Sequence, residues 1–218
     1  MRKLFVLTVL LFAVVAAIAA EPEYIVEPYT GRYGGTLFLS TTSGPKTLNP
    51  ANAQETSSTD IIGWFLEQLV DFDKNGGIRG GQLAKSWEVS EDGRSYIFHI
   101  RKGLKWSDGH PFTAEDVYFS FAKIWTNPDN AGDTYDVITD DEGNPPTVEL
   151  IDEYTVKITY NKPFAPGLRY VGSVDILPKH ALEEAVNNGT WLETWTVADI
   201  DKIVGMGPFI VKEYTEGV

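Results

Sequence analysis

The segment LAKSWEVSEDGRSYIFHIRKGLKWSDGHPFTAEDVYFSF, residues 83–121, contains two strand patterns, two Asp-Gly turns and the start of a helix. Leu83–Val89 is apolar and aromatic enough for a buried strand, and Ser90–Gly93 supplies turn residues, with Gly93 free to adopt a positive φ. Residues 96–101 follow a period of two, which places successive side chains on opposite faces of a sheet. The segment therefore predicts a β-hairpin.

A helix is predicted after the second turn, Asp108–Gly109. Pro111 cannot donate to a central ladder, so the sheet should end there. The Thr113 hydroxyl can accept from the first-turn N–H groups while Asp116 reaches back, which makes a capping box. The apolar positions at i, i+4 and i+7 predict the buried face of this helix: Val117, Phe121 and Ile124.

Composition excludes several classes of function. The chain has 218 residues with 18 basic and 31 acidic side chains, a formal net charge of −13, which disfavours nucleic acid or an anionic membrane as a partner. Cysteine is absent, so no disulfide, thiolate metal site or lipid-bearing cysteine can form. The sequence contains no phosphate-binding loop and no nucleophile elbow, and we expect His99, His110 and His180 to be structural.

Residues 1–20 have the pattern of a secretory signal peptide. Arg2 and Lys3 precede the apolar run Leu4–Ala20, which ends in small residues. We expect cleavage after Ala19 or Ala20; an uncleaved membrane anchor is the alternative.

Further elements follow from periodicity and turn residues. Helices are predicted from Ser57, with Asp60 completing a capping box, to about Val70, and from Pro178, with an apolar side of Ala181, Leu182 and Ala185. Short strands are predicted at 36–41, 148–150, 155–160, 171–177 and 209–214, and a long acidic surface loop at 127–146, which lacks the spacing of a calcium loop. Trp64 could pack in the core or line a pocket.

The 83–121 segment resembles the signature region of the extracellular solute-binding proteins of family 5, the peptide- and nickel-binding subunits of ATP-driven (ABC) importers. The resemblance is carried by Ser86-Trp87, Asp92-Gly93, Arg101-Lys102-Gly103, Trp106, Asp108-Gly109, Pro111, Thr113–Val117 and Ser120-Phe121. Weaker matches are Leu48-Asn49-Pro50, Ile176–His180 and Gly205–Phe209.

The resemblance implies a mixed α/β fold of the periplasmic-binding-protein type, with two lobes. On this chain it assigns residues 1–20 to a signal peptide, 21–49 to the first lobe, 50–170 to an inserted smaller domain and 171–218 to the return into the first lobe. The closing lobe would follow the position of Val218, so we expect this chain alone to bind ligand weakly or not at all.

The resemblance also implies a ligand-binding protein without catalytic residues, metal or cofactor. At the positions where members of this family contact their ligand, this chain would have Thr42, Ser43, Thr56, Ser57, Met206 and Gly207. The expected ligand is an oligopeptide, with oligosaccharides or nickel as the less usual cargo, and the expected partner is a membrane permease. We expect an exported monomer, in the periplasm or at the cell surface.

Two other interpretations stay open from the sequence. One is a secreted carbohydrate-active enzyme or its accessory domain, since six tryptophans suit sugars as well as peptides. The other is a truncated product with no independent function.

Overall fold

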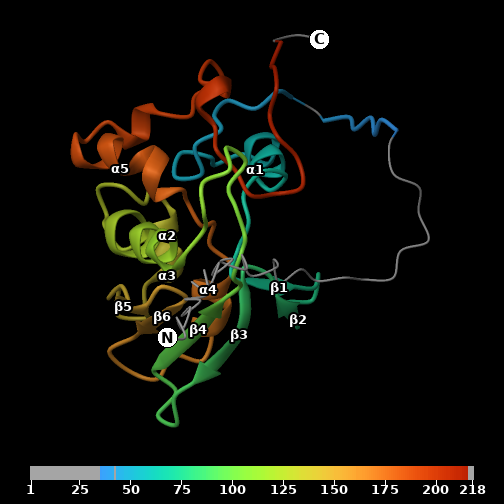
Figure 1. The fold of residues 1–218 in the computed structure, drawn as a ribbon. Helices are drawn as coiled ribbons and strands as arrows, with labels where there is room; N and C mark the ends of the chain where they lie inside the picture. Colours follow the sequence, from blue (N-terminus) through green and yellow to red (C-terminus); the bar gives the residue numbers. More distant parts are fainter. Residues whose placement is uncertain (1–34, 42, 216–218) are drawn as a thin grey trace, which may run out of the picture.

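The computed structural model describes residues 35–41 and 43–215 (Figure 1). The predicted signal peptide, the lead-in to Tyr33 and Thr42 lie outside the described residues. None of the helices in the described part reaches the length and apolarity needed to cross a bilayer.

A four-stranded antiparallel sheet forms the lower half of the molecule in Figure 1. Its order is β3 (Ala84–Val89), β4 (Ser95–Ile100), β6 (Thr155–Thr159) and β5 (Thr147–Asp152). The predicted hairpin is confirmed, with Trp87 opposite Phe98 and Glu88 opposite Ile97. The strands predicted at 148–150 and 155–160 are confirmed as well.

Helix α2 (Ala114–Phe119) covers this sheet and continues as a π-helical segment, η1 (Ser120–Trp125). The predicted capping box is present: the Thr113 hydroxyl accepts from the Glu115 N–H, and Asp116 accepts from the Thr113 N–H. All three predicted core positions, Val117, Phe121 and Ile124, are fully buried.

The remaining elements complete the molecule around one continuous apolar core. A hairpin of β1 (Val70–Phe72) and β2 (Ile78–Gly81) stands beside the sheet. The helices are α1 (Thr56–Ile62), α3 (Thr134–Ile138), α4 (Gly167–Gly172) and α5 (Lys179–Asn187), with short 3-10 turns η2 (Trp191–Glu193) and η3 (Ile200–Lys202). In Figure 1, α1 and α5 lie in the upper half.

The helix predicted from Ser57 to about Val70 is wrong at both ends. It begins at Thr56 after Glu55, without a side-chain cap, so the capping box of Ser57 with Asp60 does not form. It ends at Ile62 with Gly63 as the C-cap, and the carbonyl groups of Phe65, Glu67 and Leu69 then accept hydrogen bonds from distant segments instead of from a further helical turn.

Three predicted strands are absent and one predicted loop is interrupted. Residues 171–177 supply the end of α4 and an isolated bridge at Asp175; a short buried apolar run cannot be told from a helix by periodicity. Residues 36–41 and 209–214 form no ladder with another strand among the described residues.

The predicted loop at 127–146 is interrupted by α3, whose Ile138 is fully buried. Helix α5 begins after Pro178 as predicted, yet Ala181 is exposed.

Candidate functional site

The loop before α1 is attached to the start of that helix. The Ser58 hydroxyl oxygen accepts from the backbone N–H groups of Lys46 at 3.0 Å and Thr47 at 3.2 Å. Ser58 also donates to the Glu55 carboxylate, and this hydrogen bond lowers the pKa of Glu55. The predicted contact residue Ser43 lies in this loop, with an exposed side chain and a carbonyl that accepts from the Thr41 hydroxyl at 2.7 Å.

Thr56 and Ser57 begin α1, in contrasting surroundings. Thr56 is exposed. Ser57 is 8% exposed, and its hydroxyl has no hydrogen-bond partner among the described residues. Since buried hydroxyls are normally paired, Ser57 is a polar group whose partner is missing from this part of the chain.

Met206 and Gly207 lie at the opposite end of α1. The backbone N–H groups of both residues donate to the Phe65 carbonyl, at 2.8 and 2.9 Å. A Cβ atom at Gly207 would meet the Trp64 carbonyl oxygen at 2.5 Å, and one at Gly205 would meet the Phe65 oxygen at 2.2 Å. The two glycines are therefore required by close backbone packing.

The structure thus brings the six predicted contact residues to two places. Ser43, Thr56 and Ser57 surround the start of α1, whereas Met206 and Gly207 lie beyond its end. A seven-residue helix spans about 10 Å, so the two sets, at its opposite ends, do not form a single cluster. Thr42 lies outside the described residues.

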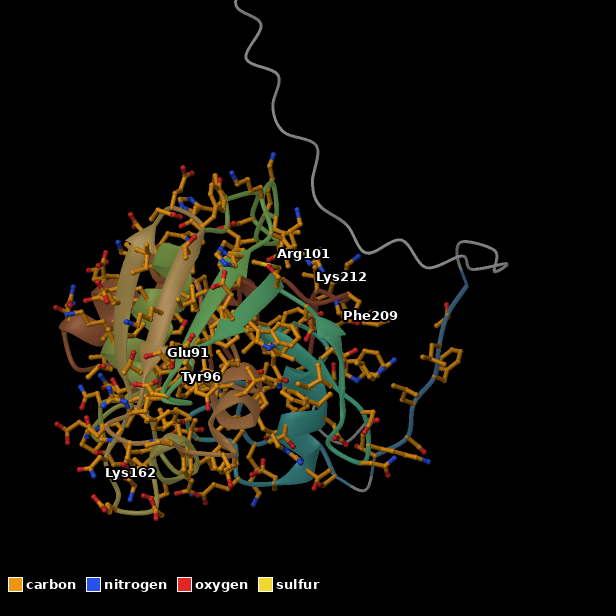
Figure 2. All side chains as sticks on the ribbon, turned by 90° about the horizontal axis from the view of Figure 1, so that it is seen from below. Glu91, Tyr96, Arg101, Lys162, Phe209 and Lys212 are labelled. Carbon is orange, nitrogen blue, oxygen red and sulfur yellow. The ribbon has the colours of Figure 1, made fainter. Side chains whose placement is uncertain are left out.

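An apolar groove of about 510 Å³ opens beside the second set. Trp64 and Phe209 form an edge-to-face pair across it, with ring centroids 5.0 Å apart. Figure 2 shows Phe209 and Lys212 at one side of the molecule, far from Lys162. The groove is lined by Leu37, Leu39, Ile61, Trp64, Phe65, Phe209, Ile210, Val211, Lys212 and Glu213.

Sequence reasoning left the role of Trp64 open and missed the rest of this groove. Ile61, Trp64 and Phe65 come from the predicted helix, and the other lining residues come from two segments predicted to be strands, whose apolar side chains should have been covered. Instead Leu37, Leu39 and Ile210 are each more than 60% exposed. The alternation of apolar residues was the available signal, but it cannot say whether a partner strand is present.

A second cavity, of about 570 Å³, is lined mostly by residues with charged or polar side chains. The His110 and His180 rings stack in it with centroids 3.9 Å apart, and His180 Nε2 lies 2.7 Å from Asp108 Oδ2. Lys179 pairs with Glu115 at 2.9 Å. These contacts agree with the predicted structural role of His110 and His180.

Asp116 connects two helices at the edge of this cavity. One carboxylate oxygen accepts from the Thr113 N–H at 3.0 Å and the other from the Lys179 N–H at 3.0 Å. Burial raises the pKa of Asp116 despite these hydrogen bonds. Within residues 35–41 and 43–215, no three His, Asp or Glu side chains are grouped so that they could hold a metal ion.

Comparison with known proteins gives one family. The model described as bacterial extracellular solute-binding proteins, family 5 Middle, matches residues 80–218. The di/tripeptide-binding protein 1 of Pseudomonas aeruginosa is 28% identical over 215 residues, which cover 91% of this chain and 37% of that protein.

Solved structures agree in fold. The periplasmic binding protein DppA of Helicobacter pylori, in complex with the peptide STSA, superposes with a TM-score of 0.64 at 27% identity, over 80% of this chain and 36% of that one. NikZ of Campylobacter jejuni, in complex with Ni(L-His), superposes with a TM-score of 0.62 at 30% identity, over 78% of this chain and 31% of that one. The chain thus spans between three-tenths and two-fifths of the length of each of these relatives.

Proposed function

Because this chain belongs to the bacterial extracellular solute-binding proteins of family 5, we propose that it is part of the substrate-binding component of an ABC importer. In this role the protein captures a small solute and delivers it to a membrane permease. The observation that carries the proposal is the family match across residues 80–218, since the fold alone could host other functions.

Oligopeptides are the proposed ligands. A relative similar over 91% of this chain is described as a di/tripeptide-binding protein, and DppA was solved with a peptide. NikZ, solved with Ni(L-His), represents the less usual cargo. Oligosaccharides are a third class to include in a ligand screen, because exposed aromatic residues such as Trp64 and Phe209 suit sugar rings as well.

The proposed organisation keeps the boundaries assigned from the resemblance. Residues 21–49 and 171–218 form first-lobe segments, and residues 50–170 form the inserted smaller domain. The proposed ligand contacts are Thr42, Ser43, Thr56, Ser57, Met206 and Gly207. The buried hydroxyl of Ser57, which has no hydrogen-bond partner among the described residues, supports its place in this set, since a ligand could supply that partner.

Peptide titration of the exported protein, in the longest form that the source cells produce, tests both the function and the site. Ser43→Trp adds bulk at an exposed position of the loop before α1 and should weaken peptide binding at least tenfold, about 1.4 kcal/mol. Glu149→Trp, on exposed β5, is the matched control and should bind like the unmodified protein.

If Ser43→Trp binds peptides with unchanged affinity, the site assignment is rejected but the proposed function is not. No heat of binding with peptides, oligosaccharides or nickel–histidine in the unmodified protein would reject the proposed function.

Export without a lipid anchor is also proposed. The basic start and apolar run of residues 1–20 support cleavage after Ala19 or Ala20, and the sequence has no cysteine to carry a lipid. The intact mass of the native protein, measured by mass spectrometry, should correspond to an N-terminus at Ala20 or Glu21 with no acyl chain. A mass that retains residues 1–19 would mean an uncleaved anchor.

A further inference from the structure

Ser58 lies in the first turn of α1 and is fully buried although its side chain is polar. Its hydroxyl oxygen accepts from the Lys46 N–H at 3.0 Å and from the Thr47 N–H at 3.2 Å, and its proton is donated to the Glu55 carboxylate. A hydroxyl has one proton to donate and two lone pairs with which to accept. The hydrogen-bonding capacity of Ser58 is therefore filled, and two of its three hydrogen bonds hold the loop before α1.

Glu55 fixes the orientation of the Ser58 hydroxyl. Since the carboxylate takes the proton, both lone pairs of the Ser58 oxygen stay available for backbone N–H groups. Glu55 Oε1 also accepts from the Lys46 N–H at 3.3 Å. Hydrogen bonds to an ionised carboxylate are stronger than those between neutral groups, so Glu55, Ser58 and the two loop amides form one connected network.

The loop is held at a second point by Tyr214. A Cβ atom at Gly44 would meet the Tyr214 hydroxyl oxygen at 2.6 Å, so the Tyr214 side chain lies directly against the Gly44 backbone. The contact residue proposed in this loop, Ser43, immediately precedes Gly44 and is exposed. The backbone from 44 to 47 is therefore fixed by two tertiary contacts, while the adjacent Ser43 side chain is open to solvent.

We propose that Ser58 is a positioning residue for ligand capture. This inference rests on the proposed function and on its contact set. Ser43 belongs to the loop, whereas Thr56 and Ser57 begin α1, and the Ser58 hydroxyl ties the two backbone segments together. It sets the position of the loop contact relative to the helix contacts before a ligand arrives. Because Ser58 has no exposed surface, it acts through the loop and touches no ligand.

Loss of this hydroxyl should slow ligand association and leave dissociation unchanged. Without it the Thr47 N–H loses its Ser58 acceptor and the Lys46 N–H keeps the longer contact to Glu55, so the loop samples more conformations. A ligand binds only the fraction of molecules in which the loop has the right conformation, and the apparent affinity falls by that fraction. The contacts of the bound state are the same, so the dissociation rate is kept.

Binding kinetics of Ser58→Ala test the proposal, in the exported protein in the longest form that the source cells produce. The probe is a library of di- and tripeptides, from which the member that the unmodified protein binds most tightly is taken for stopped-flow kinetics. We expect Ser58→Ala to bind this peptide with an association rate on the order of tenfold lower, at an unchanged dissociation rate.

Ser120→Ala is the matched control. The Ser120 hydroxyl is also fully buried; it accepts from the Leu177 N–H at 2.8 Å and donates to the Asp116 carbonyl at 2.7 Å, so its bonds connect η1 to α2 and to the segment before α5. Since each variant removes one buried hydroxyl with its hydrogen bonds, both should lower the urea midpoint by comparable amounts. Only Ser58→Ala should slow association, a difference that a purely structural role of Ser58 does not produce.

Glu55→Ala is the second variant, for the case that Ser58→Ala does not fold. Glu55 is only partly buried, and its loss frees the Ser58 hydroxyl to rotate, so association should slow in the same direction by a smaller factor. An unchanged association rate in Ser58→Ala, or in Glu55→Ala where the former does not fold, would overturn the positioning role, as would equal slowing in Ser120→Ala. If the unmodified protein binds no member of the library, the proposed capture of peptides is rejected and the positioning role with it.

Discussion

Asn49 is a fully buried polar residue that joins the beginning of the described chain to its later part. Its amide nitrogen donates to the carbonyls of Trp191 at 2.9 Å and Thr194 at 3.2 Å, and its oxygen accepts from the Ala51 N–H at 2.9 Å. We predict that Asn49→Ala lowers the free energy of unfolding by about 3 kcal/mol, because buried backbone groups lose their partners.

Urea unfolding measures this loss. Asn52→Ala is the matched control on the same loop: among the described residues the exposed Asn52 side chain makes one hydrogen bond, to the Leu192 carbonyl, so we expect a loss of under about 1 kcal/mol. Similar losses for the two variants would contradict the prediction that the buried hydrogen bonds of Asn49 stabilise the fold more than the exposed one of Asn52.

Gly207 gives a second prediction at the level of single residues. A methyl group there would press against the Trp64 carbonyl and the Phe65 Cα, and backbone atoms cannot turn aside as side chains do. We expect Gly207→Ala to lower the thermal midpoint by several degrees, about 2 kcal/mol of overpacking. Gly80→Ala, where the added atom has nothing within 4 Å, should leave the midpoint nearly unchanged; an equal fall in both would refute the packing explanation.

Among the elements, α2 depends most clearly on a local signal. Its capping box uses the Thr113 hydroxyl, and Asp116 in that box also accepts from the first residue of α5. We predict that Thr113→Ala lowers the free energy of unfolding by about 1 kcal/mol, whereas Thr113→Ser, which keeps the hydroxyl, loses much less. Chemical denaturation followed by circular dichroism distinguishes the two variants. An equal loss in both would mean that the Thr113 methyl group, which both variants lack, matters and the hydroxyl does not.

Elements with complete local signals were predictable from the sequence, and those that depend on distant partners were not. The hairpin β3–β4 and the cap of α2 are specified by residues within a few positions of one another. Residues 63–70 do not continue α1, and the Phe65 and Leu69 carbonyl groups accept from distant segments instead; no periodicity within residues 56–70 reports those contacts. Met206 and Gly207 were assigned as ligand contacts from the family resemblance, and that assignment stays a prediction; their packing against Phe65 is a long-range contact that the sequence did not reveal.

At the scale of the whole molecule, the apolar groove is the most unusual feature for a protein surface. Leu37, Leu39 and Phe209, which line the groove, are all more than half exposed, on a chain whose net charge is −13. We predict that this chain binds a hydrophobic dye such as anilinonaphthalene sulfonate at the groove. Phe209→Ser with Ile210→Ser should reduce the dye signal at least severalfold, whereas Val137→Ser, at an exposed apolar residue of α3, should not. Undiminished dye binding by the double variant would place the apolar site elsewhere.

The long-range bonds of Asn49 also set an order of events during synthesis. Asn49 and its partner Trp191 are 142 positions apart, a stretch that a ribosome translates in roughly 7 to 28 s. Strands β3 to β6 can pair as soon as residue 159 has emerged, whereas α1 must wait for Trp191, Thr194 and the Gly205–Gly207 loop. Residues 46–62, which include Asn49 and α1, are therefore among the last of the described residues to reach their final packing, after the four-stranded sheet has formed.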